Sequence, residues 1–136
     1  MDAAIRQADR TLCAMEAHAR LKVWGKITEV GTRIFRVSGP AVQRRYPELV
    51  EDWRAALVAA RVAIAMGVAA RDDAVFAERI ETARSALRRS EAYMRLAHEL
   101  GVVPPRDYAV IEARLSEVQA MLVGLRRRVL GRRRSG

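Results

Sequence analysis

The chain has 136 residues, of which 51% are hydrophobic and only 5% aromatic, and its formal net charge is +9. This length suits one domain with a buried core, and the composition is typical of packed helices rather than sheets. Of the 25 basic residues 23 are arginines, an excess that favours an anionic partner such as nucleic acid, an acidic protein or a membrane surface.

Four segments repeat apolar residues with a seven-residue rhythm that predicts helices. The first begins near Ala3 or Leu12 and ends near Val37, because Ser38-Gly39-Pro40 follows. The second begins at Pro47 and ends near Ala70. Its expected core face comprises Leu49/Val50, Trp53, Leu57, Ala60, Ile64 and Val68.

The third segment runs from about Ala74 to Leu100, with an aspartate of Arg71-Asp72-Asp73 as its expected N-cap and Gly101 just past its end. Pro104-Pro105 opens the fourth, whose apolar stripe comprises Tyr108, Ile111, Leu115, Val118, Leu122, Leu125 and Val129. Short connections between long helices predict an all-α, up-down-up-down antiparallel four-helix bundle. We assign residues 1–131 to this bundle domain and residues 132–136 to a basic, disordered tail.

The second helix is apolar on more than its core face. Between Ala55 and Ala70 only Arg61 is charged, and a second stripe is formed by Val58, Val62 and Met66. Because a bundle helix needs only one apolar face, we expect these three residues to form a subunit interface. The alternative is an alanine-rich helix that tolerates exposure to water.

The sequence contains no recognisable catalytic or metal-binding motif. His18 and His98 lie on different predicted helices without a glutamate three residues before either, and HExxH, CxxC and glycine-rich phosphate loops are absent. We therefore expect no catalytic residue, metal, cofactor or small-molecule substrate. Cys13 is the only cysteine, which favours the cytoplasm, and no stretch suits a bilayer of ~30 Å, so we expect no membrane partner.

Two basic segments inside the predicted bundle could bind an anion. Arg44 and Arg45 precede Tyr46 in the first interhelix turn, where they could hold phosphate and stack a base. The alternative is a solvated turn whose tyrosine packs on the end of the bundle. The third helix carries three further arginines, Arg84, Arg88 and Arg95. Nearby glutamates can pair with them, which favours a solvent-exposed face of salt bridges.

The strongest candidate is the arginine-rich end, with six arginines in nine residues and no acid after Glu117. The helix dipole explains one or two of them, at ~0.3–1 kcal/mol each. If all six contacted phosphates, the slope of log K against log salt would be roughly −4 to −5. We therefore predict sequence-independent binding of RNA or DNA by Arg126, Arg127, Arg128, Arg132, Arg133 and Arg134 together with Arg44 and Arg45. The alternative is a solubility tail.

Leu21-Lys22-Val23-Trp24-Gly25-Lys26 resembles the opening of the four-helix-bundle proteins encoded in intervening sequences of 23S ribosomal RNA genes. Tyr46-Pro47, the nearly uncharged second helix, Leu100-Gly101-Val102-Val103 and Tyr108 extend the resemblance over about residues 12–130. The accessory variability determinant proteins of diversity-generating retroelements share this architecture, and the basic balance resembles them more. The Asn and the Glu-Gly pair that the RNA-gene relatives often carry in the second helix are missing here.

This resemblance implies a non-enzymatic protein that forms a homopentameric barrel of four-helix bundles and binds a reverse transcriptase and its template RNA. It transfers no individual functional residue. We therefore expect a basic oligomeric accessory protein that binds nucleic acid, either template RNA or cDNA, and a reverse transcriptase. The alternative is a protein-interaction scaffold or adaptor of the same fold that does not bind nucleic acid.

Overall fold

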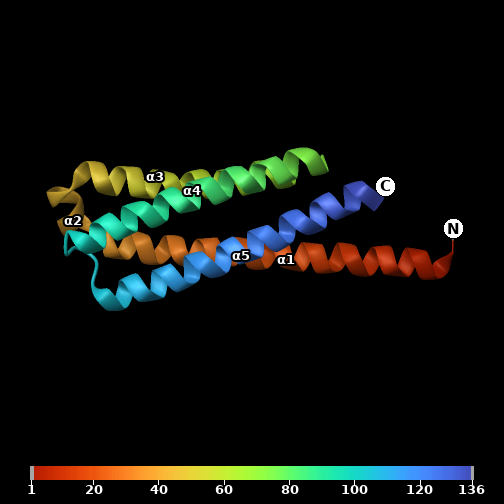
Figure 1. Cartoon of the computed structure of the whole chain (residues 1–136), viewed down its shortest axis with the longest axis horizontal. Coiled ribbons are helices and arrows are strands. Elements are labelled where there is room, and N and C mark those ends of the chain that lie inside the picture. Colours follow the sequence, from red (N-terminus) through yellow and green to blue (C-terminus); the bar gives the residue numbers. More distant parts are fainter. Residues whose placement is uncertain (1, 136) are drawn as a thin grey trace.

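The computed structural model describes the backbone of residues 2–135 and the side chains of residues 2–4, 6–7 and 20–131. This backbone contains no strand and forms five helices: α1 (Ala3–Val37), α2 (Pro40–Arg45), α3 (Pro47–Ala69), α4 (Asp73–Glu99) and α5 (Pro105–Ser135). The four long helices alternate in direction along one axis (Figure 1). The predicted all-α antiparallel four-helix bundle is therefore confirmed.

The helix ends follow from local residues. The Asp72 carboxylate accepts hydrogen bonds from the backbone N–H groups of Ala74 and Val75, at 2.8 and 3.2 Å, and so caps α4. Gly101 follows α4 with a φ of 77°, a left-handed conformation that favours glycine. Asp2 caps α1 through the Ala4 N–H, which places the start of α1 at Ala3 rather than Leu12.

The heptad stripes form the core. Buried apolar residues on all four long helices make one cluster, which includes Ile27, Trp53, Ile80 and Leu122. Val68 is the clear exception, because 43% of it is exposed and the neighbouring Gly67 is buried instead. Val68 lies in the last turn of α3. The predicted core position at Val68 is therefore wrong.

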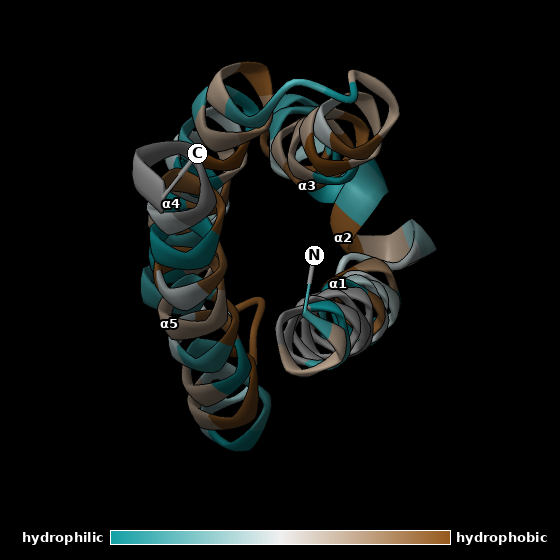
Figure 2. Ribbon diagram, turned by 90° about the vertical axis from the view of Figure 1, so that its right-hand side faces the viewer, coloured by the Kyte–Doolittle hydropathy of each residue, from teal (hydrophilic) through white to brown (hydrophobic). Residues whose placement is uncertain are grey.

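The four long helices do not pack equally on one another. α3 packs most extensively on α4, α4 on α5 and α5 on α1, whereas α1 and α3 meet over a much smaller area. Figure 2 looks along the bundle and shows this order around the core. The bundle therefore has one open side, between α1 and α3.

Two details differ from the sequence-based expectation. Residues 40–45 form the short helix α2 instead of a turn, with Pro40 at its start, where the missing N–H costs no hydrogen bond. α5 continues as helix to Ser135, so the backbone of Arg132–Ser135 is not the disordered tail that we predicted. Arginine is a good helix former, and a single Gly131 costs only ~1 kcal/mol.

No helix in the described part of the chain combines the length and the apolar character needed to cross a bilayer.

Replacing Leu122 by alanine tests the core. Leu122 is fully buried on α5, so Leu122→Ala should lower the free energy of unfolding by about 2–5 kcal/mol, measured by urea denaturation. Leu96→Ala is the matched control, because Leu96 is 45% exposed on α4 and its truncation should change stability by less than ~0.5 kcal/mol. Equal effects of the two substitutions would contradict the assignment of the core.

Candidate nucleic-acid interface

The arginine-rich end of α5 is part of a packed helix. Leu125 and Val129 are buried, and the three arginines between them point to other sides of the helix, because successive side chains are turned by roughly 100°. Arg126 is half-buried, whereas Arg127 and Arg128 are exposed. The arginines of this end therefore have different environments.

Arg126 has an acidic partner on the neighbouring helix. Its Nε lies 3.5 Å from Oε1 of Glu81 on α4, and Nη1 of Arg84 lies 2.8 Å from the same oxygen. Although no acid follows Glu117 in the sequence, Arg126 therefore has an acidic partner. The reason lies in the tertiary structure, because the packing of α4 on α5 brings Glu81 close to Arg126.

Arg127 and Arg128 remain unneutralised. Both are exposed, and neither forms an ion pair with any side chain that the structure describes. Among the predicted binding residues of α5 with described side chains, these two are the free cations. Arg132, Arg133 and Arg134 were also predicted to bind, but their side chains lie outside the described residues.

Arg44 and Arg45 do not join this group. They are exposed on α2, at the end of the bundle opposite the C-terminal end of α5 (Figure 1). The Arg45 guanidinium lies 5.3 Å from the centre of the Tyr46 ring, and Tyr46 is half-buried between α2 and α3. Arg45 thus already covers this ring, which leaves less of it for a base. One chain therefore presents two separate basic regions.

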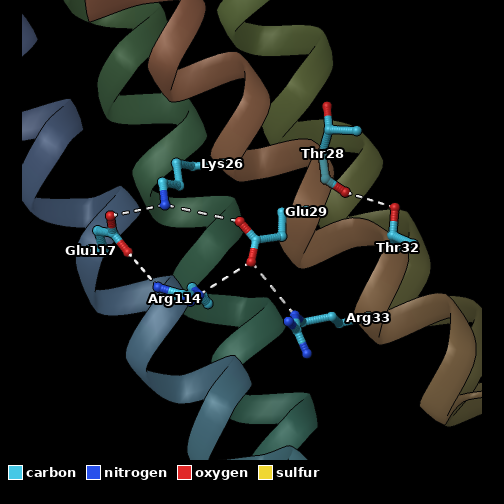
Figure 3. Close-up of polar contacts among 7 residues, drawn as sticks. All are labelled: Lys26, Thr28, Glu29, Thr32, Arg33, Arg114 and Glu117. Atoms are coloured by element: carbon cyan, nitrogen blue, oxygen red, sulfur yellow. Dashed lines mark hydrogen bonds and ion pairs between the residues drawn. The ribbon is translucent and has the colours of Figure 1, made fainter.

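Other basic side chains form ion pairs between α1 and α5 (Figure 3). The Glu29 carboxylate lies 3.2 Å from Arg114, 3.7 Å from Arg33 and 4.0 Å from Lys26. The Glu117 carboxylate lies 3.2 Å from both Lys26 and Arg114. The hydrogen bond from Lys26 is the main cause that lowers the pKa of Glu117 below its ordinary value of 4.5. This network of ion pairs joins the two helices.

The predicted second apolar stripe is exposed. Val58, Val62 and Met66 are 51%, 49% and 47% accessible on α3, so they face away from the core of their own chain. Of the three, Val58 lines a groove of about 440 Å³ between α1 and α3, on the open side of the bundle, together with Phe35 and Arg61 among others. The structure confirms that the stripe is exposed, and its role as an interface stays a prediction.

Two exposed aromatic residues on α1 extend this face. Arg61 of α3 lies 4.6 Å from the centre of the Trp24 ring, and Arg54 lies 4.6 Å from that of Phe35. Sequence reasoning missed these pairs. The available signal was that Trp24 and Phe35 fall outside the heptad stripe of α1.

Metal-ligating side chains are not clustered in the described residues. Among their side chains, no group of three or more histidines, cysteines, aspartates or glutamates could hold a metal ion. His98 Nδ1 lies 3.0 Å from the Val103 carbonyl oxygen, and its ring stacks on Tyr108 at 4.3 Å, so it fastens the connection between α4 and α5. The side chains of Cys13 and His18 lie outside the described residues.

The fold and its surface define a small, basic, antiparallel helical bundle. Residues 19–124 match the model of the 23S rRNA-intervening sequence protein family, and the chain belongs to this family. The matched span covers α2, α3 and α4 completely but ends before Arg126, so the arginine-rich end lies beyond it. No curated protein matches the chain.

Acidification should weaken the ion-pair network that joins α1 and α5. Because the pKa of Glu117 is lowered in the folded chain, its ion pairs stabilise the fold above about pH 4.5, and this contribution is lost as the pH falls through the folded pKa. Between about pH 7 and about pH 3, the urea midpoint of the wild type should therefore fall more than that of Glu117→Gln.

Glu78→Gln is the matched control for this measurement. Glu78 is exposed on α4 and forms no ion pair with the side chains that the structure describes, so its variant should keep the pH dependence of the wild type. If Glu117→Gln also kept that dependence, the ion pairs of Glu117 would contribute nothing to stability.

Proposed function

We propose that this protein is a non-enzymatic accessory protein that binds the backbone of a nucleic acid and acts as an oligomer beside a reverse transcriptase of a diversity-generating retroelement. The observation that carries the proposal is the pair Arg127 and Arg128, exposed at the end of a packed helix without a described acidic partner. A net charge of +9 supports it, because nonspecific binding of nucleic acid depends on such charge.

Arginine on a rigid helix suits this role. Its planar guanidinium donates two parallel hydrogen bonds to a phosphate, and it is more weakly hydrated than lysine. α5 is packed along its apolar stripe up to Val129, so Arg127 and Arg128 have a fixed place on the bundle. Such contacts recognise phosphates and not bases, which makes the expected binding independent of sequence.

Assembly would multiply this surface. Val58, Val62 and Met66 are exposed on α3, and Trp24 and Phe35 are exposed on α1, with Val58 and Phe35 lining the same groove. Exposed apolar side chains gathered in this way often mark an interface. Each added subunit brings another basic end of α5, which raises the effective concentration of binding sites along one strand. A homopentamer is what the resemblance to accessory variability determinant proteins implies.

The reverse transcriptase and the retroelement are part of the proposal because of that resemblance. The family membership supports the bundle, and the arginine-rich end of α5 is the feature that favours the accessory variability determinant proteins within this architecture. A polymerase that copies RNA needs its template held without regard to sequence, and a basic surface of phosphate-binding arginines supplies such a hold.

Neutralising Arg127 and Arg128 tests nucleic-acid binding. In fluorescence anisotropy with a single-stranded RNA, Arg127→Gln/Arg128→Gln should reduce the slope of log K against log salt by about 1.4, since each contact with a single strand contributes ~0.7. At ~50 mM salt the affinity should fall by roughly tenfold per contact.

Arg89→Gln/Arg106→Gln is the matched control, because both arginines are exposed and the net charge changes equally. This variant should lose much less affinity. Absence of RNA binding by the wild type at low salt would contradict the proposal. Retention of RNA affinity with loss of a protein partner in the Arg127/Arg128 variant would favour the adaptor alternative.

A charge on the exposed stripe tests assembly. Val62 is 49% exposed, so Val62→Glu should leave the bundle folded but place a charge in the proposed interface. Light scattering after size exclusion should change from the mass of an oligomer to 15.2 kDa, the mass of one chain. Leu96→Glu, on an exposed site of α4, should leave the oligomer intact. A monomeric wild type would refute the interface.

A further inference from the structure

A cleft between α4 and α5 gathers three arginines around one carboxylate. Its volume is about 330 Å³, and Glu81, Arg84, Arg126 and Arg127 line it together with the apolar side chains of Val123 and Leu130. Within this lining, three positive charges face a single negative charge. The cleft therefore keeps an excess of positive charge after its internal ion pairs are formed.

Two of the cations converge on one oxygen. Arg84 Nη1 lies 2.8 Å and Arg126 Nε lies 3.5 Å from Oε1 of Glu81. Two guanidinium groups this close to a common atom repel each other, and the carboxylate between them offsets that repulsion. Glu81 thus stands where an anion is needed.

Arg84 is held in place from α5. Its Nε donates a hydrogen bond to Oε1 of Gln119 at 3.2 Å, and Gln119 Nε2 donates one to the backbone oxygen of Arg84 at 3.0 Å. Arg84 therefore cannot easily turn away from the cleft when its acidic partner leaves. This prepares the cation for an incoming anion, and a group held in place before binding loses less conformational entropy.

Glu81 satisfies Arg126 poorly. Arg126 Nε is buried, and its separation of 3.5 Å from Glu81 does not make a hydrogen bond. A buried donor without an acceptor is costly, so a ligand that places an oxygen within hydrogen-bond distance of Arg126 Nε gains from completing this bond. Arg127 stands exposed in the lining with no described acidic partner and can meet the same ligand.

We propose that this cleft binds a phosphate group of a nucleic-acid strand, and that Glu81 is an internal competitor that occupies the phosphate position in the free protein. The inference rests on the proposed nucleic-acid binding and gives it a specific site. The non-bridging oxygens of a phosphate accept paired hydrogen bonds from the planar guanidinium of arginine.

The competition is reversible because Glu81 is not trapped. Its side chain is 39% exposed, and ion pairs at such a surface are weak, so it can turn into water when a phosphate enters. The apolar Val123 and Leu130 can then contact the sugar that follows the phosphate. In the free protein, Glu81 thereby offsets the repulsion between Arg84 and Arg126. Because an incoming anion must displace Glu81, the affinity for short or isolated anions is lowered.

Removing the charge of Glu81 should therefore strengthen binding. Glu81→Gln should raise the affinity for single-stranded RNA about three- to tenfold at ~50 mM salt and steepen the salt slope by up to ~0.7, the contribution of one phosphate contact. Glu78→Gln, one turn earlier on α4, changes the net charge equally outside the cleft lining and should have a much smaller effect. The gain should vanish in Glu81→Gln/Arg84→Gln.

Inorganic phosphate provides a probe that needs no RNA. In an NMR titration, phosphate should shift the Nε–Hε signals of Arg84 and Arg126 at lower concentrations in Glu81→Gln than in the wild type. RNA oligonucleotides with a 5′-phosphate or a 5′-hydroxyl then separate a terminal from an internal phosphate as the ligand. Preferential binding of the former identifies the end of a strand, and equal binding identifies the backbone.

The outcomes separate this inference from the proposed function. If RNA binds but Glu81→Gln and Glu78→Gln behave alike, the competitor role of Glu81 is wrong while nucleic-acid binding stands. If the wild type binds no RNA but phosphate shifts Arg84 and Arg126, the cleft is a phosphate site and the proposed function is wrong. If phosphate leaves both signals unchanged in Glu81→Gln, the site is refuted.

Discussion

Burial of one apolar stripe per helix fixes the rotation of each long helix about its axis, and the rest of the surface depends on that rotation. On α1, burial of Ile27 and Ile34 turns Lys26 and Glu29 towards α5 and Trp24 towards α3. The same constraint makes one flank of α1 a charged joint and the other an aromatic face. The hydrophobic core thus decides which charges meet and which remain open to solvent.

The net charge of +9 therefore does not show by itself which side chains are available to bind an anion. Lys26, Arg33 and Arg114 share two carboxylates in the joint between α1 and α5. Arg54 and Arg61 lie over aromatic rings on the open side. Arg127 and Arg128 on α5 are exposed without a described acidic partner, and the packing of α5 gives them a fixed position on the bundle.

The spacing of apolar residues predicted the bundle and most of its core, because helical periodicity is information local to each segment. It failed at Val68, whose exposure depends on where the neighbouring helices lie. An aspartate of Arg71-Asp72-Asp73 was predicted as the N-cap of α4, which is also local information, and the structure identifies it as Asp72. The pairing of Arg126 with Glu81 was not predictable, because it requires the packing of α5 against α4. Candidate cations could be found from sequence, but their neutralisation could not.

The family match ends inside α5. Residues 19–124 match the family model, and the arginine-rich end of α5 begins just beyond, yet α5 passes through this boundary as one helix. Leu122, Leu125 and Val129 are buried on both sides of it, so one core orients the shared scaffold and the added charge. The arginines are thereby held in register with Glu81 and Arg84 on α4. A charged end on a flexible linker would lack that register and could attract a polyanion, but it could not form a defined phosphate site.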